Sequence, residues 1–220
     1  MQKLLFALVF LSVAAHAVDI TVKPTQLRFL IGNQTTSPDQ VNNVLRPAGL
    51  NTLSGISTYG IEATYEIIPR VNVGVRGEGK WQKVKETGAP VNAQNPFYSS
   101  LQQSAALGIA RVDLVSTPIV KVDVFGGAGT AATSMDIRTA AGDGNYSHAM
   151  GSVITQAGAS VGMGWSNIYF LIEVGQEWNK IGDLGKTGVT ASGLDTIDLS
   201  GTYLAVGLIF NGLPSWIHQK

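Results

Sequence analysis

The sequence lacks cysteine and carries little charge. With no cysteine among 220 residues, disulfides, thiolate metal sites, cysteine nucleophiles and the lipidated cysteine of a lipoprotein are all excluded. Asp, Glu, Lys and Arg make up 14% of the chain, against roughly 25% in soluble domains. The formal net charge is zero, so the composition indicates no nucleic-acid partner.

A long hydrophobic run is also missing beyond the first residues. Hydrophobic residues form 45% of the chain, yet no later stretch approaches the 18 or so consecutive apolar residues of a membrane helix. A chain that is apolar on average without such a run indicates apolar side chains distributed over alternating strands.

The first 17 residues have the pattern of a signal peptide. Lys3 precedes an apolar run of about 12 residues, from Leu4 to Ala15, and Ala15-His16-Ala17 forms an Ala-x-Ala cleavage site. The run is short for a membrane anchor helix. We therefore expect cleavage after Ala17 and a mature chain of residues 18–220.

Beyond residue 17 the hydrophobic period is two. From Val71 to Trp81, odd positions carry mainly Val, Gly and Trp, and even positions mainly Asn, Arg, Glu and Lys. Only a strand separates these two sets onto opposite faces. Such runs predict eight strands, at 23–32, 55–68, 70–84, 101–115, 119–136, 151–165, 168–181 and 198–210.

The connections between these strands alternate strictly between long and short. Long ones are expected at 33–54, 85–100, 137–150 and 182–197, and short ones at 69, 116–118 and 166–167. All short turns therefore lie at one end of the molecule, as in outer-membrane barrels with short periplasmic turns and longer extracellular loops. In hydrocarbon an open sheet edge would leave amides unpaired, so the sheet must close. The sequence predicts an all-β protein, an eight-stranded antiparallel up-and-down transmembrane barrel.

The two faces of the predicted strands differ in chemistry. Aromatic residues fall near both strand ends on the apolar face, as expected of two membrane-interface girdles; they are Tyr59, Tyr65, Trp81, Trp165, Trp178 and Phe210. The opposite face is predicted to carry an interior ion-pair network, because unpaired buried charges are costly. Its members are Arg28, Glu62, Glu66, Arg76, Glu78, Lys80, Arg111, Asp113, Lys121, Asp123, Glu173 and Glu177. On the fourth strand Leu107 and Ile109 share the parity of Arg111, so part of the interior is expected to be apolar.

With leader, strands and loop asymmetry together, the chain resembles the small outer-membrane β-barrel proteins, namely the transmembrane domain of outer membrane protein A and the protein X and W groups. Tyr-Gly-Ile-Glu-Ala-Thr-Tyr at 59–65 and Leu-Ala-Val-Gly-Leu-Ile-Phe at 204–210 are strand motifs of this type. The resemblance implies a terminal aromatic residue for assembly. Phe210 takes that place, although a tail, 211–220, follows it.

The residues do not point to catalysis. His-x-Ser, which the resemblance would imply for a lipid A deacylase, is absent at both histidines after the leader, His148 and His218. A cluster of Asp143, Ser147 and His148 in a loop is more typical of a solvated surface. Glu62 with Glu66 could serve as acid and base, but the nearby cations favour a structural role. We expect no enzyme, no metal site and no cofactor.

Three functions remain open. The first is a structural and surface-interaction protein, whose long loops contact an extracellular partner. A short helix capped by Ser37 or Asp39 is expected in the first loop. The second is a narrow channel for small solutes, and the third a soluble lipocalin-type barrel, which requires the faces to be inverted. We expect a monomer in the outer membrane of a Gram-negative bacterium, in contact with lipid and lipopolysaccharide.

Overall fold

The computed structural model describes residues 25–36, 38–87, 97–140, 142–165, 167–188 and 194–212. The predicted leader, and the tail from residue 213 on, lie outside these ranges. Eight long strands form the body: β1 (Gln26–Thr35), β2 (Gly55–Ile68), β3 (Val71–Lys85), β4 (Tyr98–Ser116), β5 (Val120–Thr139), β6 (Gly142–Trp165), β7 (Ile168–Ile181) and β10 (Gly201–Asn211). The smaller elements are α2 (Asp39–Leu45), β8 (Gly185–Gly188) and β9 (Ile197–Asp198). Among the described residues, no helix is long and apolar enough to cross a bilayer.

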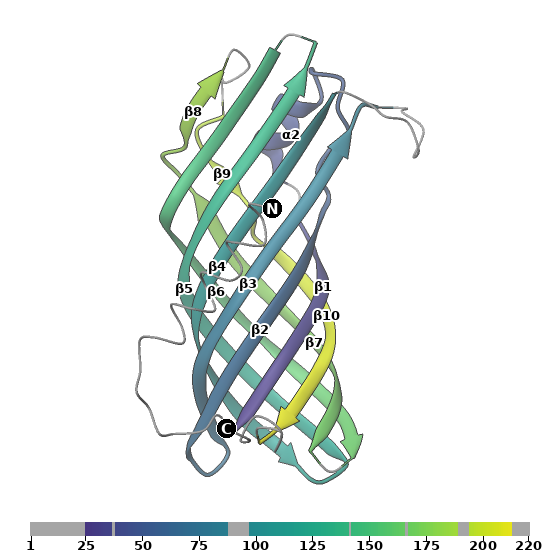
Figure 1. Ribbon diagram of the computed structural model, residues 1–220, viewed down its shortest axis with the longest axis vertical. Coiled ribbons are helices and arrows are strands. Elements are labelled where there is room, and N and C mark those ends of the chain that lie inside the picture. Colours follow the sequence, from purple (N-terminus) through teal and green to yellow (C-terminus); the bar gives the residue numbers. More distant parts are fainter. Residues whose placement is uncertain are drawn as a thin grey trace, which may run out of the picture.

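The eight long strands close into a ring of antiparallel neighbours. From β1 to β6, each long strand pairs with the one that follows it in the sequence, and β10 pairs with both β7 and β1. The closing pair runs from Gln26 opposite Asn211 to Gln34 opposite Tyr203. Closure leaves the long strands without a free edge over the paired region, which satisfies their backbone amides without water. This confirms the predicted fold class (Figure 1).

The short connections gather at one end, which we call the lower end, and α2, β8 and β9 lie at the opposite, upper end (Figure 1). At the turn between β2 and β3, Pro69 is followed by Arg70 at φ 70°, the positive φ that a type II turn requires at its third residue. At the turn between β4 and β5, the Thr117 side chain accepts hydrogen bonds from the backbone N–H groups of Ile119 and Val120.

The upper connections differ in part from the sequence prediction. The hairpin between β5 and β6 is short, so most of the loop expected at 137–150 is strand and His148 lies within β6. The first loop contains the expected helix, but Asp39 is its first residue and Pro38 is the N-cap, with no side-chain capping bond. Ser37 lies outside the described residues.

The long strands β4, β5 and β6 change polarity along their length. In their lower halves they turn charged side chains such as Arg111 and Asp123 inward and apolar ones such as Val161 outward. In their upper parts Leu101, Met135 and Tyr146 are buried inside, while outward positions carry polar residues. The predicted strands 101–115 and 119–136 include Leu101 and Met135, whereas residues 142–150 of β6 have this inverted alternation and were expected to be a loop.

Candidate functional site

Large apolar side chains cover the lower outer surface of the ring. They form a band, which we call the apolar belt, and its members include Phe29, Ile31, Ile61, Val75, Val124, Val161, Met163, Phe170, Ile172, Val174, Leu204 and Val206, each at least 40% exposed. An exposed band of this kind is stable in hydrocarbon and not in water. A soluble lipocalin-type barrel, which would carry its charged side chains outside, is inconsistent with this surface.

The six predicted interface aromatics all point outward. Tyr59, Trp81, Trp165 and Trp178 are 47–86% exposed, and Tyr65 and Phe210 are half-buried. The Tyr59 ring lies so close over Gly79 of the neighbouring strand that a Cβ there would approach its Cζ to 2.1 Å. At the lower end the Phe210 ring contacts Phe29 edge-on, with 5.9 Å between centroids.

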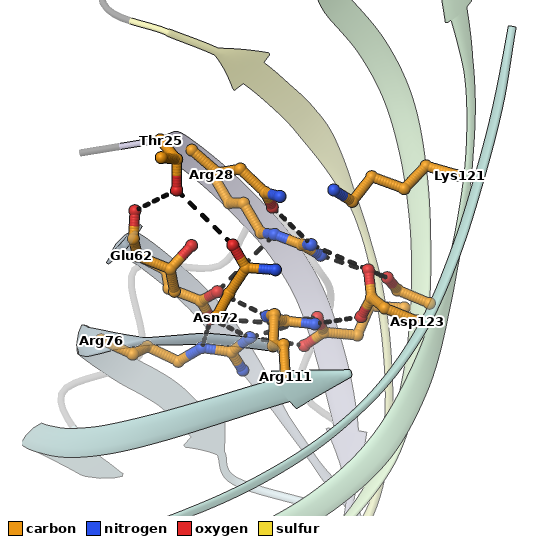
Figure 2. Close-up of polar contacts among 12 residues, drawn as sticks. Thr25, Arg28, Glu62, Asn72, Arg76, Arg111, Lys121 and Asp123 are labelled. Atoms are coloured by element: carbon orange, nitrogen blue, oxygen red, sulfur yellow. Dashed lines mark hydrogen bonds and ion pairs between the residues drawn. The ribbon is translucent and has the colours of Figure 1, made fainter. Parts of the chain in front are cut away.

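Three arginines from different strands meet in the lower interior, as Figure 2 shows. Arg28 on β1, Arg76 on β3 and Arg111 on β4 have fully buried side chains, and all three lie within ion-pair distance of Glu62 on β2. Arg111 contributes most: its Nε lies 2.5 Å from Glu62, one terminal nitrogen 2.6 Å from Asp123, and the other 2.7 Å from Glu173. The bridges thus connect strands on all sides of the ring.

The remaining bridges close this cluster into rings. Arg28 lies 2.8 Å from Asp123, and Arg76 lies 2.9 Å from Glu173 and 3.3 Å from Glu78. The Gln156 amide donates to both Glu78 and Glu177, at 2.7 and 2.9 Å, and Glu177 pairs with Lys80. We call the connected set the interior network: Arg28, Glu62, Arg76, Glu78, Lys80, Arg111, Asp123, Glu173 and Glu177.

A separate pair lies below this network. The Lys121 ammonium is 2.9 Å from Asp113, which also accepts a hydrogen bond from Asn72. Eleven of the twelve charges predicted for the interior are therefore paired, and Glu66 is the exception. The Glu66 carboxylate is exposed at the lower rim beside the β2–β3 turn and accepts a hydrogen bond from the Arg70 backbone N–H.

Sequence reasoning missed the neutral partners of these charges. The Phe125 ring lies between two guanidinium groups, 5.1 Å from Arg76 and 4.3 Å from Arg111, where its π face favours cations. Tyr203 donates a hydrogen bond to Glu173 at 3.1 Å. Phe125 has the same inward strand parity as Lys121 and Asp123, and this parity was the one sequence feature that could have placed Phe125 in the interior.

An apolar cluster fills the barrel above the interior network. We call it the upper core, and it consists of Val41, Leu45, Leu50, Leu53, Ile56, Val84, Leu101, Met135, Ile137, Tyr146, Ile181, Leu184, Leu194, Ile197 and Leu199. The helix α2 places Val41 and Leu45 in it with no exposed surface. The first loop therefore folds back into the barrel. A separate, smaller cluster on the β4–β6 side contains Leu107 and Ile109.

The space left in the interior is small. A cavity of about 20 Å³ is lined by residues that include Gln34, Arg76, Glu78, Lys80, Glu173 and Glu177. A single water molecule needs a cavity of about 10–15 Å³. The cavity therefore holds about one water-sized species.

A closed antiparallel ring with short turns at one end, an apolar belt, aromatic girdles and a polar interior is the fold of a small outer-membrane β-barrel. No family model and no curated protein sequence matches the chain. Solved structures similar to it include Neisserial surface protein A, at 14% identity and a TM-score of 0.47, covering 84% of this chain and 95% of that one.

Two further solved structures are also similar to the chain. OprG of Pseudomonas aeruginosa is 12% identical, with a TM-score of 0.49 and coverage of 86% of this chain and 96% of that chain. Ail, the attachment invasion locus protein of Yersinia pestis, is 10% identical with a TM-score of 0.42, covering 85% and 98%. At these identities the likeness concerns the fold alone, and the assignment of the barrel depends on its own topology and surface.

Proposed function

We propose that this chain is a non-enzymatic surface protein of a bacterial outer membrane, in which the barrel is a closed anchor and the upper end contacts an extracellular partner. The observation that carries this proposal is the double obstruction of the interior. The interior network lies across the lower half, and the upper core lies above it. A solute would have to disrupt both layers to pass.

The upper end has the features of a presented surface. The α2 side chains of Asp39, Gln40 and Asn43, which do not enter the upper core, are exposed and polar. The four residues of β8 are all exposed as well. The upper core fixes the backbone beneath these residues, so a partner would meet an ordered surface, which lowers the entropic cost of binding.

A conductance measurement separates this proposal from the channel alternative. Purified full-length protein in a planar bilayer should give no current steps at any voltage, because the charges of the interior network are held by mutual ion pairs. A variant with Arg111→Gly and Leu45→Gly, which opens both layers, serves as the positive control. Reproducible steps from the unaltered protein would establish the channel and refute the closed anchor.

A protease test on intact cells checks the orientation. Trypsin added outside should cleave at the upper end, where Lys186 of β8 is exposed, and should leave Arg70 in the lower turn intact. Opening the cells to protease should expose the Arg70 site. Cleavage at Arg70 in intact cells would show the opposite orientation.

A further inference from the structure

The interior network is not electrically balanced. It contains four cations, Arg28, Arg76, Lys80 and Arg111, against five carboxylates, Glu62, Glu78, Asp123, Glu173 and Glu177. The separate pair of Lys121 and Asp113 is neutral as a whole. One negative charge therefore has no counterpart inside a ring surrounded by apolar side chains. An uncompensated buried charge strongly destabilises a fold.

The imbalance is concentrated at Glu78. This carboxylate has one ion pair, with Arg76 at 3.3 Å, and Arg76 lies closer to Glu62 and Glu173, at 2.6 and 2.9 Å. The second Glu78 oxygen accepts a hydrogen bond from the neutral Gln156 amide. The Glu78 side chain is nonetheless only 10% exposed.

The small cavity lies beside this residue, and a second group in its lining lacks a partner. Gln34 has no exposed surface. Its amide nitrogen donates to the Leu199 carbonyl and to Glu177, which fixes the orientation of the amide. Its Oε1 atom has no hydrogen-bond partner among the described residues. A carbonyl oxygen without a donor and an excess carboxylate thus line the same cavity, and oxygen atoms of both kinds are ligands for hard cations.

We propose that this cavity binds one small monovalent cation of the size of sodium, with oxygen ligands from Glu78 and Gln34. The volume of about 20 Å³ admits one such ion. The excess negative charge is a single unit, which favours a monovalent ion over a divalent one. The site is independent of any partner at the loops.

Thermal unfolding of the full-length protein, refolded in detergent, tests the site. The unfolding midpoint is measured by circular dichroism in NaCl and in N-methylglucamine chloride of equal ionic strength. We expect a saturable rise with Na⁺ of at least about 2–4 °C, because a ligand that binds only the folded state stabilises it. The bulky organic cation cannot enter and should have no such effect.

Three variants define the ligands. Glu78→Gln removes the excess charge, so its midpoint should be independent of Na⁺ and, in N-methylglucamine, higher than that of the unaltered protein. Gln34→Leu keeps the excess charge but loses one ligand, so half-saturation should require at least tenfold more Na⁺. Glu66→Gln makes the same charge change at the exposed rim and should keep the full Na⁺ dependence.

Two results would overturn the proposal. Equal midpoints of the unaltered protein in the two salts, with stability falling as the pH rises, would show that a proton on Glu78 supplies the missing charge. Loss of the Na⁺ effect in Glu66→Gln to the same extent as in Glu78→Gln would show general charge screening. The unaltered protein and Gln34→Leu suffice for the test if Glu78→Gln fails to fold.

Discussion

At the residue scale, an arginine–carboxylate ion pair affects stability very differently inside the barrel and on its outer face. Arg111 has no exposed side-chain surface and bridges three carboxylates. Arg138 pairs with Asp143 on the upper outer face, where the two side chains are 51% and 62% exposed. Removing one partner of a buried cluster leaves the others uncompensated, whereas water replaces the partner of an exposed pair.

We therefore predict that Arg111→Met destabilises the barrel by about 3–5 kcal/mol. The matched variant Arg138→Met should cost less than about 1 kcal/mol. Urea unfolding of both variants in lipid vesicles, followed by tryptophan fluorescence, measures the difference. Equal losses in the two variants would mean that the interior network does not stabilise the fold.

Single residues also show which parts of the site could be predicted from the sequence. Strand parity was enough to place Arg28, Glu62 and Arg111 on one face. Parity cannot give the register between strands, and so it could not show that Glu62 lies among three arginines. Parity also could not show that Glu66, which pairs with the buried Asn72, lies at the exposed rim beside the β2–β3 turn.

At the scale of the elements, α2 depends on the upper core. It has seven residues and no side-chain cap, too few for an isolated helix to be stable in water. Leu45 and Val41, both fully buried, hold it by packing, and the Asn42 side chain exchanges two hydrogen bonds with the Leu53 backbone. The loop conformation is therefore a result of packing rather than of helix propensity.

Leu45→Ala should loosen α2 and leave the ring intact, because deleting a buried leucine costs about 2–5 kcal/mol and the strands do not depend on this helix for closure. Hydrogen–deuterium exchange at the Arg46 backbone N–H, which donates to the Asn42 carbonyl at 3.0 Å, should then be at least tenfold faster. Asn43→Ala, on the exposed side of α2, is the control and should not change the rate. On gels, the difference in migration between unboiled, folded protein and boiled, unfolded protein should be the same in both variants as in the unaltered protein.

The strands themselves were predicted with uneven success. β2 and β7 have the predicted bounds, 55–68 and 168–181, because both contain one clean alternation of apolar and polar residues. β6 begins at Gly142 rather than near 151. Its upper part has glycine, asparagine and serine on the outer face, and this composition is typical of loops when the buried Tyr146 is not recognised as an inward residue.

At the scale of the whole molecule, the exposed tryptophans predict the position of the membrane. Trp81 and Trp178 lie at the upper limit of the apolar belt, and Trp165 lies at its lower end, with all three exposed. The belt between them consists of aliphatic residues and phenylalanine. This distribution implies two interfaces separated by hydrocarbon.

Variants in which Trp216 is also replaced, so that one of these three residues is the single tryptophan of the chain, should report that arrangement in vesicles. Lipids brominated near the headgroup should quench each of them more strongly than lipids brominated near the chain ends. Replacing Val161, in the middle of the belt, with Trp should reverse the order. Weak quenching of Trp165 by both lipids would place the lower end of the belt outside the bilayer.

The change of polarity along β4, β5 and β6 has a consequence for how the sequence can vary over evolution. Below the change, an outward charge would have to enter hydrocarbon and would cost about 2–4 kcal/mol at mid-depth, so Val161 and Val124 can exchange only with other apolar residues. Above it, outward positions such as Asp136, Arg138 and Ser147 are in water, and their identity is limited only by strand formation. Among descendants of this protein, the residues of the upper outer face can therefore vary more freely, while the strand segments below keep an apolar outer composition.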